Sequence, residues 1–321
     1  GQSTYVPWSG APLASRDRVS WRVDFRDENG KEGGWSEPAT VEEGLLSAAD
    51  WKAKWIRPAG QADPVKESVG SLRRSFAISK KVASARLYVT ARGLFEMQLN
   101  GQRVGNDHFA NGFTDYHKRI DTLTYDITGQ LRQGDNALTA LLGDGWYAGR
   151  FPFAAKTKGF YGKDPALLVQ VEITYDDGTS DTIVSDEKWE GTYDGPIVAS
   201  SIYDGEEYDA RRQAGNWAPV IAESDLGSAI LMPKPFPPVR QTNTLSVQKI
   251  TQLEAGRYVF DLGQNMVGWA RINIPVEKDQ TVTMRFAERL KEDGTLYTYN
   301  LRSAKATDSD TAAENVAVQW Q

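Results

Sequence analysis

The chain has 321 residues, of which 40% are hydrophobic and 25% charged, and this predicts a soluble globular protein of two or three domains. Its 43 acidic and 37 basic side chains give a net charge of −6, which argues against nucleic acid or an anionic membrane surface as partner. The absence of cysteine excludes disulfides, thiolate metal sites and a cysteine nucleophile, and the presence of only two histidines argues against a His-rich zinc site or a Ser-His-Asp triad. No apolar run is long enough to span a bilayer, and the sequence leaves the compartment open.

Residues 1–47 are predicted to form part of a small β-domain. Three apolar residues alternate with polar ones as along one face of a half-buried strand: Trp21, Val23 and Phe25. A complete sandwich does not fit into this length, so we expect that upstream strands are missing from the sequence. The segment that follows contains Trp51 and Trp55, which we expect to dock against the next domain.

Residues 48–235 have dense strand signals, which predict an antiparallel sandwich of the jelly-roll type. The clearest alternating runs are Leu87, Val89 and Ala91; Phe95, Met97 and Leu99; and Leu167, Val169, Val171, Ile173 and Tyr175. Asn100-Gly101 predicts a two-residue hairpin turn, because both positions tolerate positive φ, and Asp176-Asp177-Gly178 predicts a second turn. Helix content should be low, with one or two short helices around residues 204–214.

The proline-rich segment Pro233–Pro238 predicts a stiff crossing into a second β-sandwich over residues 236–308. Its strand signals lie at residues 258–263, 270–274 and 282–287, and the first two are expected to pair. Residues 309–321 are weakly patterned and are predicted to be a tail.

The segment Leu142–Arg150 combines three glycines with Trp146, Tyr147, Asp144 and Arg150. Its glycine content argues against a buried strand, because glycine contributes no side-chain packing and costs backbone entropy. An aromatic platform beside a carboxylate and a guanidinium suits a sugar, whose C–H face can lie on the ring while its hydroxyls bind the polar groups. Two interpretations remain: a sugar platform, or a structural corner whose tryptophan plugs one end of the sandwich.

The segment Ser200–Arg211 is dense in tyrosine, carboxylate and arginine, which predicts a buried polar network that pins one domain against the next. Sugar contact is the alternative. Asp261–Asn265 ends a strand in a turn, where the amides of Gln264 and Asn265 can donate and accept hydrogen bonds. They either close the turn or contact a neighbouring domain or a ligand.

Several common motifs are absent: there is no GxxxxGK[ST], no GxGxxG that opens a helix and no HExxH, which argues against nucleotide binding and that type of zinc hydrolase. His117 lies in a polar loop and is more typical of a solvated than of a catalytic histidine. Four oxygen donors close in sequence could suit calcium, although their spacing matches no EF-hand: Asn106, Asp107, Asn111 and Asp115.

Seven segments together resemble bacterial α-L-rhamnosidases of glycoside hydrolase family 78. In chain order they are Ala53–Ile56, Ala85–Tyr88, Gly112–Tyr116, Leu142–Arg150, Ser200–Arg211, Asp261–Trp269 and Asp293–Arg302. The resemblance covers nearly the whole chain, in the family's order and spacing. It implies an all-β fold of successive β-sandwiches with little helix: a partial fibronectin-III-like domain (1–47), a jelly-roll resembling carbohydrate-binding module 67 (48–235) and a second β-sandwich (236–308).

The resemblance also implies that the parent enzyme hydrolyses terminal α-L-rhamnosides with inversion, using one carboxylic acid to protonate the leaving oxygen and a second to activate water. In the family these carboxylates lie in an (α/α)6 barrel that follows the region ending near Asp308. No helical repeat for such a barrel occurs in this sequence, so no catalytic residue is assigned. The chain is expected to be the non-catalytic N-terminal part, which braces the catalytic domain.

The jelly-roll is further expected to bind L-rhamnose, or rhamnosylated glycans and glycosides. The predicted carbohydrate-binding residues are Asp115, Tyr116, His117, Asp144, Trp146, Tyr147 and Arg150. The predicted structural network comprises Tyr203, Asp204, Glu206, Tyr208, Arg211, Gln264 and Asn265. Rhamnose-binding members of module 67 depend on calcium, but basic residues near His117-Lys118 stand where an acid/amide pair is expected, so no metal site or cofactor is assigned and calcium stays an option. The alternatives are a free-standing lectin-like protein and a small glycosidase that uses carboxylates within these domains.

Overall fold

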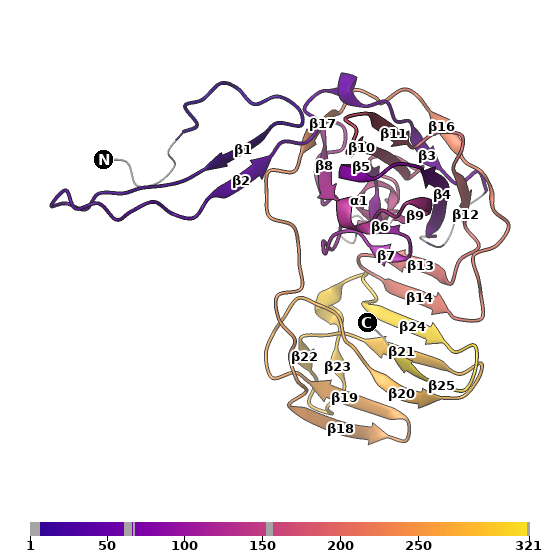
Figure 1. Ribbon diagram of the computed structural model, residues 1–321. Coiled ribbons are helices and arrows are strands. Elements are labelled where there is room, and N and C mark those ends of the chain that lie inside the picture. Colours follow the sequence, from indigo (N-terminus) through magenta and orange to yellow (C-terminus); the bar gives the residue numbers. More distant parts are fainter. Residues whose placement is uncertain (1–6, 61–65, 67, 152–156, 320–321) are drawn as a thin grey trace.

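The computed structural model describes residues 7–60, 66, 68–151 and 157–319. Three parts follow one another along the chain: an N-terminal ribbon that extends to one side, a central sandwich, and a C-terminal unit of small sheets that contains the end of the chain (Figure 1). Among the described residues every helix is a single turn, and none is long and apolar enough to cross a membrane. The helices are η1 (Ala48–Asp50), η2 (Thr128–Gln130), α1 (Gly145–Ala148) and η4 (Tyr299–Leu301). The prediction of an all-β fold is confirmed.

The N-terminal ribbon pairs β1 (Arg18–Trp21) with β2 (Ala39–Glu42) in antiparallel register. The prediction of a half-buried strand as far as Phe25 is wrong, because β1 ends at Trp21 and the three alternating apolar side chains are all exposed. A two-stranded ribbon has no second layer to cover either face, so alternation alone does not bury these residues.

The central sandwich consists of two sheets. One has the order β16-β3-β10-β5-β8-β17, with β11 also paired to β10, and the other has the order β15-β12-β4-β9-β6-β7. The first sheet contains β3 (Trp55–Arg57), β5 (Val82–Arg92), β8 (Arg119–Asp126), β10 (Ala166–Tyr175), β11 (Ser180–Val184), β16 (Ile221–Glu223) and β17 (Ile230–Pro233). The second contains β4 (Gly70–Ile78), β6 (Leu94–Leu99), β7 (Gln102–Arg103), β9 (Gly134–Gly143), β12 (Glu190–Thr192) and β15 (Ala218–Pro219).

The three predicted alternating runs are confirmed as β5, β6 and β10, and they meet in the main core. Both predicted turns are confirmed, with β6 and β7 joined through Asn100-Gly101 at positive φ. The outer face of the seven-stranded sheet is covered as well, by a second core that includes Trp51 and Trp55. The tryptophans of the tethering segment therefore dock as predicted.

The C-terminal unit takes part of its structure from the middle of the chain. The hairpin of β13 (Ile197–Ser201) and β14 (Gly205–Asp209) continues through β24 (Thr307–Thr311), which runs parallel to β14, to β21 (Thr281–Arg285). The short helices predicted around residues 204–214 are therefore wrong. The backbone reverses at Gly205, which has φ +102° and lies close to the carbonyl of Thr307, so β14 forms against a strand a hundred residues away rather than as a local helix.

The rest of the C-terminal unit is built from two-stranded sheets. Its strands are β18 (Lys249–Glu254), β19 (Arg257–Asp261), β20 (Asn273–Val276), β22 (Arg289–Leu290), β23 (Leu296–Tyr297) and β25 (Val316–Gln319). The predicted pairing of segments 258–263 and 270–274 is wrong, because β19 pairs with β18 and β20 pairs with β25. The weakly patterned tail also enters the sheets through β24 and β25, since pairing with distant strands supplies the order that local sequence lacks.

Candidate functional site

The segment Leu142–Arg150 turns the chain at one end of the central sandwich. β9 ends at Gly143, and α1 forms one turn before the chain leaves the sheet. Gly145 has φ +54°, and a Cβ built on it would lie 2.6 Å from Leu94 Cγ, so a larger residue fits neither the backbone nor the space. The predicted alternative of a glycine-rich corner therefore describes the backbone of this segment.

The two adjacent aromatic residues of this corner face inward rather than to open solvent. Trp146 Nε1 donates a hydrogen bond to the Tyr203 hydroxyl at 3.2 Å, and the Trp146 ring lies 5.7 Å from the ring of Phe113. Tyr147 packs edge-on against Tyr116 at 5.5 Å. Tyr116 itself is buried, and burial raises the pKa of its hydroxyl. Tyr116 belongs to the second core, and Trp146 and Tyr147 pack against it.

The charged groups of the corner are also occupied by protein partners. Asp144 is buried and pairs with Lys158 at 3.2 Å, and burial raises the pKa of its carboxyl. The Arg150 guanidinium forms an ion pair with Asp204 and donates to the Ser303 hydroxyl at 2.9 Å and to the Ser303 carbonyl at 3.1 Å. Arg150 therefore joins the central sandwich to the β13–β14 turn and to the C-terminal unit at once.

Most of the predicted structural network lies at this joint. Asp204 also accepts from the Lys305 backbone N–H at 3.1 Å, and the Glu206 N–H donates to Asp308 at 2.8 Å. Burial, followed by the charges of Asp308 and Asp310, raises the pKa of Glu206 to about 7. Burial likewise raises the pKa of Tyr208, next along β14 on the same face.

Three predicted network residues lie apart from these contacts. Arg211 binds Asp209 and Asp279 at the far end of β14. Gln264 and Asn265 are exposed in the loop after β19, and their side chains make no hydrogen bond to other described residues. The structure therefore brings together the β13–β14 members of the predicted network but not the amides.

An open aromatic surface borders the corner. We call it the aromatic end; it comprises Phe109, Phe113, Phe151, Phe160, Tyr161 and His117. Phe113 and Phe160 are 53% and 58% exposed, and the ring of Tyr161 lies 4.8 Å from Phe160 and 5.1 Å from His117. Asp115 lies at its rim, where it accepts from the His117 N–H at 3.2 Å and pairs with Lys118 at 3.3 Å. Of the predicted sugar-binding residues, Asp115 and His117 are the ones that face solvent here.

Three of the four predicted calcium donors, Asp107, Asn111 and Asp115, have protein partners in the structure. Asp107 accepts from the Tyr125 hydroxyl at 2.6 Å, and Asn111 is buried with its side-chain oxygen accepting from the Ala91 N–H at 3.3 Å. Within the described ranges, no group of three or more histidine, aspartate or glutamate side chains is arranged to hold a metal ion.

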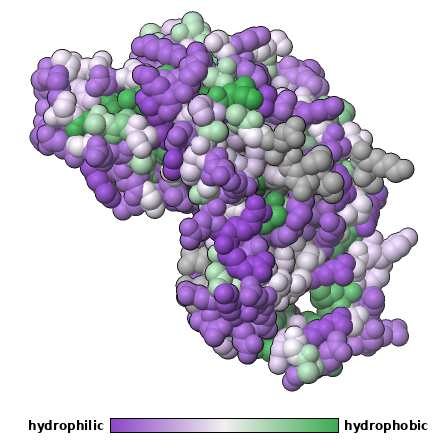
Figure 2. Space-filling model, turned by 90° about the vertical axis from the view of Figure 1, so that its right-hand side faces the viewer, coloured by the Kyte–Doolittle hydropathy of each residue, from purple (hydrophilic) through white to green (hydrophobic). Residues whose placement is uncertain are grey.

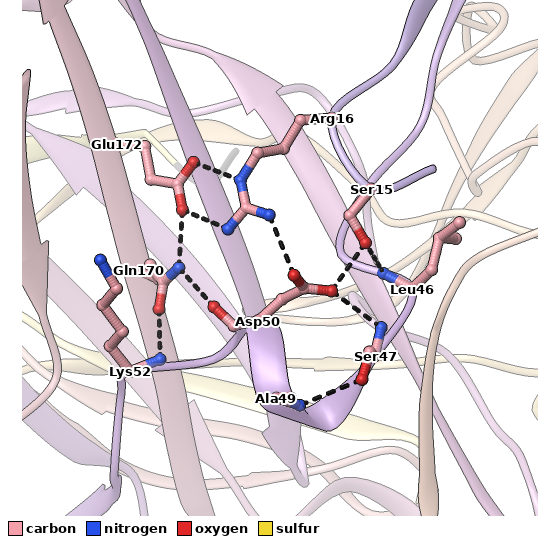
Figure 3. Close-up of polar contacts among 9 residues, drawn as sticks. All are labelled: Ser15, Arg16, Leu46, Ser47, Ala49, Asp50, Lys52, Gln170 and Glu172. Carbon is pink, nitrogen blue, oxygen red and sulfur yellow. Dashed lines mark hydrogen bonds and ion pairs between the residues drawn. The ribbon is translucent and has the colours of Figure 1, made fainter. Parts of the chain in front are cut away.

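A second polar cluster, not predicted from the sequence, joins the N-terminal ribbon to the sandwich (Figure 3). Arg16 binds Glu172 of β10 through two hydrogen bonds of 2.6 and 2.7 Å, and it binds Asp50 at 3.1 Å. Asp50 accepts in turn from Ser15 and from the Ser47 N–H, and these hydrogen bonds lower the pKa of its carboxyl. The Ser47-x-x-Asp50 spacing is a capping signal that could have indicated part of this clamp.

Comparison with known proteins identifies the family. The model described as the α-L-rhamnosidase N-terminal domain matches residues 80–251, more than half of the chain. The chain belongs to the bacterial α-L-rhamnosidase family. A bacterial α-L-rhamnosidase concanavalin-like domain matches residues 251–321, and a Rha78A-like N-terminal immunoglobulin domain matches residues 1–47, where a fibronectin-III-like domain was expected.

Curated relatives and solved structures agree with this assignment. The α-L-rhamnosidase of Alteromonas sp. (strain LOR) is 40% identical over 95% of this chain and 35% of its own length, and that of Streptomyces avermitilis is 42% identical over 87% and 28%. The crystal structure of the Aspergillus terreus α-L-rhamnosidase is similar with a TM-score of 0.91 and 35% identity, over 98% of this chain and 38% of that one. The Streptomyces avermitilis enzyme complexed with L-rhamnose gives 0.89 and 27%, over 100% and 48%. This chain therefore spans about a third of the length of the curated relatives it matches.

Proposed function

We propose that this chain is the non-catalytic N-terminal region of a longer α-L-rhamnosidase and that it braces the catalytic domain. The family match and the share of the relatives that the chain spans support this proposal. The parent enzyme would remove terminal α-L-rhamnosyl groups with inversion, using a carboxylic acid and a carboxylate outside this chain. The described residues form β-sheets and single-turn helices, which is the architecture of a scaffold around such a site.

The observation that carries the bracing role is the joint at Arg150. Its guanidinium holds Asp204 and Ser303, which are 54 and 153 residues away in the sequence. Trp146 adds its bond to Tyr203 in the same turn. Since β14 pairs with β24 inside the C-terminal unit, the contacts of Arg150 and Trp146 with the β13–β14 turn fasten that whole sheet to the sandwich. Such a tie presents the C-terminal unit to a following domain in a fixed orientation.

We also propose that the aromatic end binds L-rhamnose. The exposed rings of Phe113 and Phe160 can cover the apolar face and methyl group of the sugar, and Asp115 and His117 at the rim can bind its hydroxyls. A rhamnose-bound structure of a relative supports this choice of sugar. Trp146, Tyr116, Tyr147, Asp144 and Arg150 would then support the surface from beneath, and calcium would not be required.

Two measurements test these roles. The purified chain should not hydrolyse an aryl α-L-rhamnoside, and turnover by the pure protein would overturn the non-catalytic assignment.

Titration with L-rhamnose, followed by tryptophan fluorescence, should show saturable binding with an affinity that is equal in the presence of calcium and of a chelator. Phe160→Ala should weaken it at least fivefold, whereas Phe236→Ala, which alters a phenylalanine with the same 58% exposure on the crossing segment, should leave it unchanged. Equal effects of both variants, or no binding, would contradict the sugar-binding role.

A further inference from the structure

The β18–β19 ribbon has an apolar outer face. Ile250 lies directly opposite Phe260, and Gln252 lies opposite Tyr258. Because side chains alternate across a strand, Ile250, Tyr258 and Phe260 share one face of the ribbon, which we call the ribbon face. These three side chains are 59%, 49% and 48% exposed.

The opposite face of the ribbon already packs within the chain. Thr251, Leu253 and Val259 are partly buried, and Leu253 Cδ2 lies 3.6 Å from where a Cβ on Gly294 would be, in the turn between β22 and β23. The ribbon therefore has a defined inner side, and the ribbon face points outward from it.

The C-terminal unit has little core of its own. Among its described residues the buried apolar cluster consists of Val276 and Ala312, with Ile274 and Val282 packed beside them. Figure 2 shows hydrophobic residues at the surface beside a hollow at the lower end of the molecule, the end where Figure 1 places β18 and β19. Single exposed apolar residues are ordinary, but a directly opposed pair on a two-stranded sheet, with its other face already packed, is typical of a surface that another segment covers.

We propose that the ribbon face is the surface on which the remainder of a longer rhamnosidase polypeptide docks; this inference rests on the proposed function. The relatives have about twice as much further polypeptide as this chain spans, and β25, the last described strand, lies in the same unit as the ribbon. A segment that continues from this unit is held close to the ribbon face, and its effective concentration makes a small apolar contact sufficient.

A second copy of the chain fits this face less well. A stable interface between separate proteins buries about 800 Å² on each partner, from roughly 20 or more residues. The ribbon face offers only three apolar side chains on two short strands. The charges beside it are mixed, since the basic residues Lys249 and Arg257 alternate with the acidic residues Glu254 and Asp261, so no strong field of one sign would attract a charged partner. The face therefore suits a tethered segment more than a free partner.

The 321 residues contain no cysteine, so single-cysteine labelling gives a direct test once any cysteine elsewhere in the complete polypeptide is replaced by serine. Ile250→Cys and the control Lys249→Cys, an exposed neighbour on the opposite side of β18, are each labelled with a maleimide in the 321-residue chain and in the complete polypeptide encoded by the gene. Ile250→Cys should react at least tenfold more slowly in the complete polypeptide, whereas Lys249→Cys should react at similar rates in both. Amide hydrogen exchange of residues 249–261 in the unmodified proteins gives an independent readout and should slow in the same comparison.

Three results would count against specific parts of the argument. Equal labelling of Ile250→Cys in both proteins, with unchanged exchange, overturns the docking surface. If Ile250→Cys is already labelled slowly in the 321-residue chain, and more slowly at higher protein concentration, the occupant of the ribbon face is a second copy and not a tethered segment. A complete polypeptide that does not hydrolyse an aryl α-L-rhamnoside overturns the proposed function, and the labelling rates still decide the docking surface.

Discussion

Removing the Arg150–Asp204 ion pair should loosen the joint between the sandwich and the C-terminal unit. The two side chains are only 18% and 23% exposed, and the guanidinium also donates two hydrogen bonds to Ser303. Hydrogen bonds to charged groups contribute about 1.5–3 kcal/mol each when buried, and truncating one partner of a buried pair costs about 3–5 kcal/mol. Asp204 keeps Lys305 at 3.6 Å, and partial exposure screens the charges. We therefore expect Arg150→Met to lower the free energy of unfolding by about 2–3 kcal/mol.

A double-mutant cycle isolates the pair from the other contacts. Arg150→Met, Asp204→Asn and the double variant are unfolded in urea and followed by tryptophan fluorescence, to which Trp146 contributes at the joint itself. The coupling free energy should be about 1–2 kcal/mol. The ion pair between Arg26 and Glu32 is as short, at 2.6 Å, but its side chains are 69% and 61% exposed, so its coupling should stay at about 0.5 kcal/mol or less. A coupling between Arg150 and Asp204 no larger than this control would refute the reasoning.

Three further predictions concern the same framework. The folded pKa of Glu206 is about 7 and its ordinary value is 4.5, because burial favours the neutral carboxyl. The neutral carboxyl therefore contributes its full stability below about pH 4.5. That contribution is lost as the pH rises through 7, which lowers the free energy of unfolding by about 1–3 kcal/mol. Between pH 5 and pH 8 the free energy of unfolding in urea should therefore fall less in Glu206→Gln than in the unmodified protein. Glu207→Gln should show the same fall as the unmodified protein. An equal fall in Glu206→Gln and the unmodified protein would exclude Glu206 as the cause. Gly145→Ala should lower the melting temperature through a cost of about 1–3 kcal/mol, while Gly129→Ala, where a Cβ meets nothing within 4 Å, should change the stability by less than about 0.5 kcal/mol; equal effects would contradict the steric argument. Arg16→Ala should speed proteolysis of the N-terminal ribbon severalfold with little change in the main unfolding transition, and unaltered cleavage would show that the clamp does not hold the ribbon.

The central sandwich was predictable because its signals are local. Alternation in β5, β6 and β10 follows directly from the side-chain period of a strand, and the turn residues fix where the strands reverse. The order of the strands in each sheet is not a local property, and the sequence did not predict it. Burial of the outer face of the seven-stranded sheet was predicted only through Trp51 and Trp55.

The C-terminal unit was harder to predict because its pairings are distant. The hairpin β13–β14 contains a glycine and several carboxylates, which local propensity assigns to a turn or a short helix. Its strand character comes from β24, about a hundred residues later. The clamp at Arg16 was missed for the same reason, since Glu172 is 156 residues away and neither residue is unusual in its own neighbourhood.

The corner at Leu142–Arg150 shows why residue type alone could not separate sugar binding from architecture. Tryptophan, aspartate and arginine serve both roles, and the difference lies in whether their polar atoms are already occupied. Here Trp146 Nε1 binds Tyr203, Asp144 pairs with Lys158, and the Arg150 guanidinium binds Asp204 and Ser303. A sugar would have to break these contacts before it could use the corner, whereas Phe109, Phe113 and Phe160 of the aromatic end are exposed without such a cost. The corner is therefore better suited to hold the aromatic end in place than to bind a sugar itself.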